Sequence, residues 1–155
     1  MKLSTREDIE APIDAVFDHL SDFPHFERLA VRHGASVRRL VGPDVLGKGA
    51  KWEASFRFRG RQREMEIEVV EFERPERLVF LGNSKNLSTV FSIELVSFSP
   101  NRTRMNVVLD SKPKTLPTRL MMQSLKVART KVTKRFKLRI ADFARSMEAH
   151  ISGQS

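Results

Sequence analysis

Few residues in this chain are of the types that carry out catalysis or bind metals. The sequence contains no cysteine and no tyrosine, which excludes disulfides, thiolate catalysis, cysteine-based zinc sites and a tyrosine proton donor. The four histidines show neither the spacing of a helical metal pair nor a neighbouring group of carboxylates; they are His19, His25, His33 and His150. Asp22 and His25 are close enough to act together as a base, although a polar bend between two helices explains them better. We therefore predict no metal site and no cofactor, and we assign no catalytic residue.

The excess positive charge lies in one segment near the C-terminus. Ten of the 28 Lys and Arg residues fall between Asp110 and Asp142, where no acidic residue occurs. These ten are Lys112, Lys114, Arg119, Lys126, Arg129, Lys131, Lys134, Arg135, Lys137 and Arg139. The other 18 basic residues are balanced by 19 acidic ones, so the net charge of +9 belongs to this segment.

This basic segment has three possible interpretations. A solvated helix face is the first, and docking to an anionic membrane surface or to an acidic protein partner is the second. Nucleic acid, the third, is disfavoured as a partner, because no DNA- or RNA-binding motif and no exposed aromatic platform is evident in the sequence.

The same segment has the apolar spacing of one long amphipathic helix, which we predict from about 117 to 151. Apolar residues recur at steps of three or four and form a single stripe; they are Leu125, Ala128, Val132, Phe136, Ile140, Phe143, Met147 and Ile151. Pro117 suits the first turn of a helix, and Gly153 lies just past the expected end. No Pro or Gly stands between them, so a continuous helix is expected.

The first part of the chain predicts a strand followed by two short helices. Leu3 to Ala11 has strand character, and Pro12 begins a helix with apolar residues at helical spacing. Phe23-Pro24 ends that helix, and a second short helix is expected around His25 to Leu29. These elements precede a long region of different periodicity.

From about Ala35 the period of the apolar residues changes from 3.6 to 2 and stays there for roughly seventy-five residues. This predicts an antiparallel meander of six strands, which with the first strand makes seven. The first strand of the meander, Ala35 to Val41, is followed by a loop at Gly42-Pro43-Asp44. A bulge is expected near Val69 to Phe72, and a turn at Arg74-Pro75-Glu76. The inner faces of the last two strands match only if the loop between them has an odd length or if a second bulge is present.

The clearest hairpin in the meander joins Lys51–Arg59 to the following alternating run. A two-residue turn at Gly60-Arg61 would set Phe56 opposite Met65 and Trp52 opposite Val69 on the inner face. The same register would set Arg57 opposite Glu64 on the outer face.

Several short motifs carry a family resemblance. Ile9-Glu10-Ala11-Pro12-Ile13-Asp14-Ala15-Val16-Phe17, then Leu20-Ser21-Asp22-Phe23-Pro24, form an opening strand, helix and break. Gly47-Lys48-Gly49 and Glu73-Arg74-Pro75-Glu76-Arg77-Leu78-Val79-Phe80 form later turns. Together with the order of elements, these motifs resemble the START-like superfamily, SRPBCC, and within it the polyketide cyclase/dehydrase and coenzyme Q-binding branches. The resemblance covers nearly the whole chain.

The resemblance implies one START-like domain over residues 1–155 with the α+β helix-grip fold. In that fold a seven-stranded curved antiparallel sheet wraps a long C-terminal helix, and two short helices follow the first strand. It also implies a ligand cavity between sheet and helix. A strongly bent sheet cannot lie flush along a helix of about thirty-five residues, roughly 50 Å long, so a gap is expected on physical grounds as well.

Large apolar residues on the inner face are the hypothetical ligand-binding residues, with one arginine. They are Trp52, Phe56, Phe58, Met65, Phe80, Phe91, Met105, Met121, Met122, Leu125 and Arg129. An ordinary packed core is the alternative explanation for any one of the aromatic residues.

Arg129 is included because it falls within the apolar stripe of the helix, where an unpaired guanidinium would be costly. We expect it to meet an anionic or carbonyl group of a ligand at the cavity mouth, together with Arg63, which has inward parity on its strand. The alternative is an arginine that extends to solvent or pairs with a sheet carboxylate such as Glu71.

The leading functional prediction is binding of a hydrophobic or amphipathic small molecule or lipid, driven by apolar burial. A cyclase- or dehydratase-type enzyme acting on polyketide-like substrates is the alternative, and an interaction module that docks acidic partners through its basic helix is a third. The N-terminal residues carry charges where a secretory signal needs an apolar run, and no stretch is long enough to span a membrane. A cytoplasmic location is therefore expected.

Overall fold

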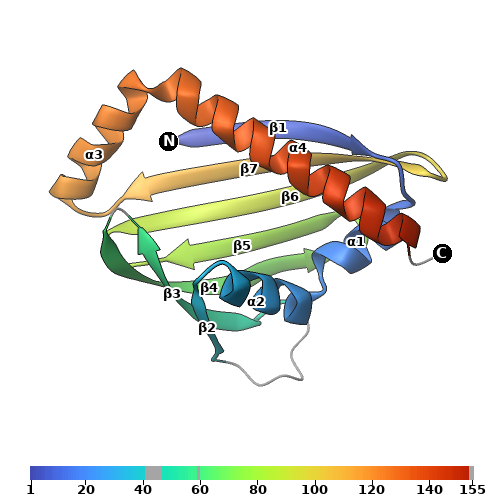
Figure 1. Cartoon of the computed structure of the whole chain (residues 1–155), viewed down its shortest axis with the longest axis horizontal. Coiled ribbons are helices and arrows are strands. Elements are labelled where there is room, and N and C mark those ends of the chain that lie inside the picture. Colours follow the sequence, from blue (N-terminus) through green and yellow to red (C-terminus); the bar gives the residue numbers. More distant parts are fainter. Residues whose placement is uncertain (41–46, 59, 154–155) are drawn as a thin grey trace.

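One curved antiparallel sheet of seven strands organises the chain (Figure 1). The computed structural model describes residues 1–40, 47–58 and 60–153; the loop predicted at 42–44 lies outside these residues. The strands are β1 (Lys2–Ile9), β2 (Ser36–Arg39), β3 (Lys51–Phe58), β4 (Arg61–Glu73), β5 (Arg77–Asn83), β6 (Leu87–Ser99) and β7 (Arg102–Pro113). Their spatial order is β1-β7-β6-β5-β4-β3-β2. The predicted α+β fold, with six strands in a meander and the first strand paired to the last, is confirmed.

Four helices complete the fold: α1 (Ile13–Leu20), α2 (Phe23–Arg32), α3 (Leu116–Val127) and α4 (Arg129–Gly153). The two short helices follow β1 as predicted. Asp22 separates them by capping α2, since its carboxylate accepts a hydrogen bond from the backbone N–H of His25 at 3.3 Å. The polar-bend interpretation of this pair therefore has a direct structural basis.

The β3–β4 hairpin forms, but in a register two residues from the predicted one. Phe56 pairs with Arg63 and Trp52 with Ile67, rather than with Met65 and Val69. The strands meet at Phe58 and Arg61, with Gly60 at φ 74°. Glycine accepts this left-handed conformation at no steric cost, and this places the turn one residue earlier than predicted. A shift of two residues keeps every side chain on its face, so the predicted inner face survives.

The predicted bulge in β4 is present, and a second bulge, rather than a loop of odd length, matches β6 to β7. The β4–β5 register shifts between Val69 and Glu71, and the β6–β7 register shifts between Ser97 and Ser99. A bulge adds one residue to one strand of the pair. The alternation of inward and outward side chains in the sequence therefore breaks at these places, while apolar side chains on both sides of the bulge still face inward. The turn at Arg74-Pro75-Glu76 also forms, with a cis Arg74-Pro75 bond.

The predicted single helix over 117–151 is wrong in one respect, because it is divided at Ala128. The N–H of Ala128 donates to Leu125 at 3.1 Å, and its backbone leaves helical geometry at φ −98° and ψ 20°. Each segment buries a different face: α3 packs against β7 with Thr118 and Met122 buried, whereas α4 packs along β1 and α1. One straight helix could not follow both surfaces, and the chain bends between them (Figure 1).

The packed core is concentrated at the end of the molecule where α1 meets the C-terminal half of α4. Phe17 and Val16 of α1 and Met147 of α4 are completely buried. They join Ile9 and inner residues of β5 to β7 in one apolar cluster. Most side chains in the first half of α4 are exposed instead. The helix therefore grips the sheet mainly through its last turns.

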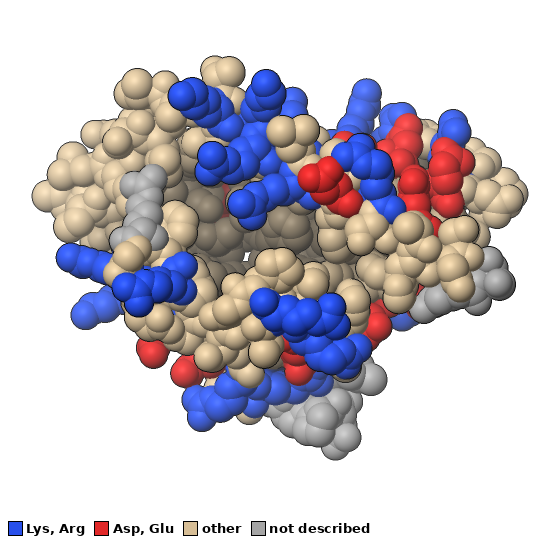
Figure 2. Space-filling view, in the orientation of Figure 1, with Lys and Arg blue, Asp and Glu red and all other residues tan. Residues whose placement is uncertain are grey.

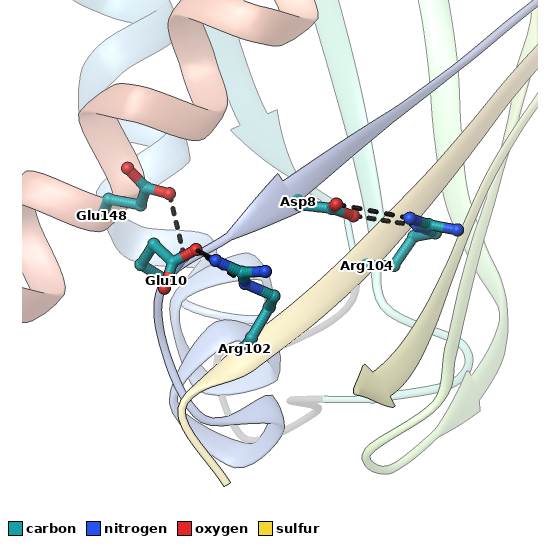
Figure 3. Close-up of polar contacts among 5 residues, drawn as sticks. All are labelled: Asp8, Glu10, Arg102, Arg104 and Glu148. Carbon is teal, nitrogen blue, oxygen red and sulfur yellow. Dashed lines mark hydrogen bonds and ion pairs between the residues drawn. The ribbon is translucent and has the colours of Figure 1, made fainter. Parts of the chain in front are cut away.

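Ion pairs fix the end of β1 to β7 and α4 on the outside of this core (Figure 3). Arg104 donates to both carboxylate oxygens of Asp8, at 2.9 and 3.3 Å, and this hydrogen bonding holds the pKa of Asp8 below its ordinary value of 3.8. Arg102 donates to Glu10 at 2.7 Å, and the N–H of Glu10 donates to Glu148 of α4 at 2.8 Å. These contacts join three elements where the chain enters α1.

Candidate functional site

A cavity of about 610 Å³ lies over the middle of the sheet, between α2 on one side and α4 on the other. Figure 2 shows its mouth as a hollow in the molecular surface. Its walls are almost entirely apolar and come from α1, α2, α4 and strands β2 to β7. A volume of this size is typical of pockets that hold drug-sized or lipid-like molecules, about 300 to 1,000 Å³.

Large side chains line the cavity without filling it. They include Phe23, Trp52, Phe80 and Phe91. Four short residues stand among them in the wall, namely Ala30, Ala35, Ala54 and Gly82. The apolar volume needed to fill the space between α2 and α4 is therefore missing.

Five of the predicted ligand-binding residues lie together in the cavity wall. They are Trp52, Met65, Phe80, Phe91 and Met105. Trp52 and Met105 are buried, at 6% and 1% exposure, so they form the floor and also belong to the packed core.

The other six predicted residues do not line the cavity. Phe56 lies beyond Ala54 toward the β3–β4 turn, and Phe58 at the end of that strand is half exposed. Met121, Met122 and Leu125 are on α3, which the break at Ala128 directs away from the cavity.

Arg129 is a separate correction, because the prediction placed it at the cavity mouth. It is exposed, and it borders a different surface hollow with Glu7 of β1 and Lys134. The prediction placed Arg129 within the apolar stripe because it assumed one uninterrupted helix from about 117 to 151. Since a new helix begins after Ala128, Arg129 takes a position on the outer surface of α4.

Arg63, the suggested companion of Arg129, does have the predicted inward orientation. It is partly buried and lies two residues from Met65 on the inner row of β4, which continues into the cavity wall. Its Nε atom is buried without a hydrogen-bond partner. Among the residues that the structure describes, Arg63 forms no ion pair, whereas six other sheet and turn arginines pair with carboxylates.

Glu27 of α2 is a wall residue that the sequence interpretation missed. Its Oε1 accepts a hydrogen bond from Trp52 Nε1 at 3.1 Å and another from Arg39. The Arg39 guanidinium lies 5.4 Å from the Trp52 ring centroid. The missed signal was helical spacing, since Glu27 is four residues after Phe23 and three before Ala30, and all three line the cavity.

Three histidines far apart in the sequence meet beside the cavity. The ring of His19 on α1 lies 5.0 Å from that of His150 on α4 and 5.5 Å from that of His25 on α2. His19 also contacts Phe26 and Phe143, two aromatic residues of the cavity wall. Within the described residues, no group of three or more His, Asp or Glu side chains is arranged to hold a metal ion.

Burial lowers the pKa of His19 below its ordinary value of 6.5, and the neighbouring His150 and His25 lower it further, while Asp22 opposes the shift. The imidazole is therefore easier to protonate in the unfolded chain than in the folded protein. The histidine cluster joins α1, α2 and α4 beside the aromatic wall of the cavity.

Comparison with known families agrees with this architecture. Residues 1–148 match the family described as "Polyketide cyclase / dehydrase and lipid transport". The chain belongs to this family. No curated protein matches the chain.

Solved structures with the same fold include three informative neighbours. TTHA0849 from Thermus thermophilus superposes over 100% of this chain and 99% of its own, with a TM-score of 0.68 and 13% identity. The Zhui aromatase/cyclase from Streptomyces sp. R1128 covers 98% and 93%, with a TM-score of 0.66 and 10% identity. A START superfamily protein from Mycobacterium smegmatis covers 86% and 95%, with a TM-score of 0.58 and 14% identity. These likenesses establish the START-like fold.

The lowered pKa of His19 predicts a loss of stability as the pH falls below about 6.5. In that range the unfolded chain binds a proton that the folded protein resists, so protonation favours unfolding. Urea unfolding at pH 7.5 and 5.5 should show a decrease in midpoint that is smaller in His19→Gln than in the wild type. His33→Gln, which removes an exposed histidine outside the cluster, is the control. An unchanged pH dependence in His19→Gln would show that the cluster does not carry the effect.

Proposed function

We propose that this protein binds a hydrophobic small molecule, such as a lipid or another long apolar compound, in the cavity between the sheet and helices α2 and α4. The observation that supports this most strongly is an apolar volume of about 610 Å³ beside an otherwise packed core. An unfilled apolar space of this size forgoes favourable contacts, and a ligand of matching shape would supply them.

The expected affinity follows from the number of methylene groups that a ligand can bury in the cavity. Each buried methylene contributes about 0.8 kcal/mol, so a chain of roughly ten to twelve carbons contributes about 8 to 10 kcal/mol. Loss of translational and rotational freedom opposes this by at least about 4 kcal/mol. The difference is at most about 4 to 6 kcal/mol, so a dissociation constant between tens of micromolar and millimolar is expected for a simple alkyl ligand, and tighter binding needs a polar anchor.

Arg63 is the proposed anchor for a ligand with an acidic end. Its inward position, its buried Nε without a hydrogen-bond partner and its location next to Met65 all support this role. A carboxylate or phosphate could accept hydrogen bonds from the guanidinium. The proposed ligand is then amphipathic, with its apolar part over Trp52 and Met105 and its anionic group toward the β3–β4 turn.

We favour binding over a cyclase-type reaction because Glu27, the carboxylate in the cavity wall, is already hydrogen-bonded within the protein. Its Oε1 accepts hydrogen bonds from both Trp52 and Arg39, and these contacts attach α2 to the sheet. This oxygen is therefore engaged in holding α2 in place, whereas a general base directs its lone pairs at a substrate. The arrangement supports a structural role for Glu27.

The first test uses Trp52, the single tryptophan of the chain, as a reporter in the cavity wall. Titration with the fluorescent fatty acid cis-parinaric acid should quench Trp52 saturably by energy transfer. Ala54→Phe fills the cavity and should weaken binding at least about tenfold, since the displaced ligand loses several methylene contacts. Ser55→Phe adds the same bulk at the next position of β3, whose side chain has the opposite parity, and should leave binding unchanged. Equal affinities in both variants would contradict a ligand in this cavity.

The second test addresses Arg63 with a matched pair of ligands, dodecanoate and dodecanol. The wild type should bind the carboxylate roughly tenfold more tightly than the alcohol, because a hydrogen bond to a charged group contributes about 1.5 kcal/mol or more. Arg63→Gln should remove this preference and leave dodecanol binding intact. Arg57→Gln, an exposed arginine on the neighbouring strand, is the control. A preference that persists in Arg63→Gln would eliminate Arg63 as the anchor.

A further inference from the structure

Helix α3 carries a second apolar face that no described part of the chain covers. Leu116, Leu120 and Val127 are 66%, 56% and 92% exposed. At about 100° per residue these three positions fall within roughly 40° of one another around the helix. Thr118 and Met122, on the other side, are the buried residues. The outer face is therefore a coherent stripe of aliphatic side chains in solvent.

Positive charge lies along one side of this stripe and continues onto α4. Arg119 and Lys126 are exposed on α3 itself, at one flank of the aliphatic residues. All ten basic residues between Lys112 and Arg139 are exposed, and no acidic residue lies between Asp110 and Asp142. Within the described residues none of the ten forms an ion pair with a carboxylate. Their charge is thus available to an external anion.

The basic surface also lies at the rim of the cavity. Figure 2 shows Lys and Arg side chains over the beginning of α4, directly above the hollow, and largely uncharged surface over α3 beside them. A flat partner that binds α3 and the start of α4 would therefore be close to the cavity mouth.

We propose that α3 and the first turns of α4 form a docking surface for an anionic lipid bilayer, with Leu116, Leu120 and Val127 inserted among the headgroups and acyl chains. Helices that lie in a membrane interface combine an aliphatic face with flanking Lys and Arg, and an anionic leaflet attracts each basic residue near it. Among the described residues no helix has the length and apolar character needed to cross a bilayer, so this contact is a peripheral one.

The chemistry of the surface favours lipid over an acidic protein. The exposed apolar side chains of α3 are aliphatic, and none is one of the aromatic anchors that usually dominate protein interfaces. The ten cations are spread over the end of β7, the following loop and the two helices α3 and α4 rather than gathered at one pocket. A broad, adaptable anionic surface fits this distribution better than a compact acidic site does.

Vesicle flotation tests the proposal directly. The wild type should float with phosphatidylcholine vesicles that contain phosphatidylglycerol, should not float with phosphatidylcholine alone, and should be released by high salt. The double variant Arg119→Gln/Lys126→Gln should bind roughly 25-fold more weakly, about fivefold for each charge removed. Arg38→Gln/Arg57→Gln removes the same charge from the outer surface of the sheet and should have little effect.

Insertion of the apolar stripe needs its own measurement. The chain has no cysteine, so Leu120→Cys can be labelled uniquely with an environment-sensitive fluorophore. Anionic vesicles should shift its emission to the blue, and should not shift a label at Val96→Cys, an exposed valine on β6. Leu120→Ser/Val127→Ser should lose at least about tenfold in vesicle affinity, while Val90→Ser/Val96→Ser should not.

The outcomes that overturn the proposal are distinct. No binding to anionic vesicles in low salt, or equal binding by the α3 variants and their controls, would exclude a membrane role for this surface. Binding to an acidic peptide but not to vesicles would assign the surface to a protein partner. Thermal unfolding of each variant confirms that it is folded, and ligand titration through Trp52 in the same samples keeps failure at this surface separate from failure of the cavity.

Discussion

The whole structure depends on a mismatch between one curved sheet and the helices that cover it. The last turns of α4 fit closely against α1 and the sheet, with Met147 and Ala144 buried. Over the middle strands α2 and α4 lie on opposite sides of the cavity and come together at its edge through Phe26 and Phe143. The side chains of the wall do not fill the space between the two helices. The close fit at one end of the molecule therefore leaves a cavity beside it.

The helix break at Ala128 completes this arrangement. If α3 continued straight from α4, it could not also pack Thr118 and Met122 against β7. The bend allows both segments to bury an apolar face. It also leaves α3 with an uncovered aliphatic side beside exposed basic residues, so the proposed docking surface arises from this change of helix direction.

Much of the fold could be predicted from the sequence, because period-2 and period-3.6 patterns report directly on which face is buried. The order of elements, the bulge in β4 and the inner parity of Trp52, Phe80, Phe91 and Met105 followed from such patterns. The hairpin register did not, because alternation is unchanged by a shift of two residues. The helix break did not either, since no Gly or Pro marks it and it results from tertiary packing. That error misplaced Arg129 and the α3 residues.

The sequence failed to predict some residues of the site for one reason. These residues come from different elements that only the fold brings together. His19, His25 and His150 looked isolated in the sequence but meet where three helices converge. Glu27 stands at helical spacing from Phe23 and Ala30, but its contacts come from other elements. Its partners Trp52 and Arg39 lie on two strands of the sheet.

Native mass spectrometry of protein purified without detergent or organic solvent tests the central claim most directly. A cavity that binds hydrophobic molecules should retain one, so a fraction of the protein should carry an additional small-molecule mass at a ratio of one to one. Apo protein should acquire the same mass when mixed with a lipid extract. A protein that carries no adduct and takes up none from the extract would contradict the account.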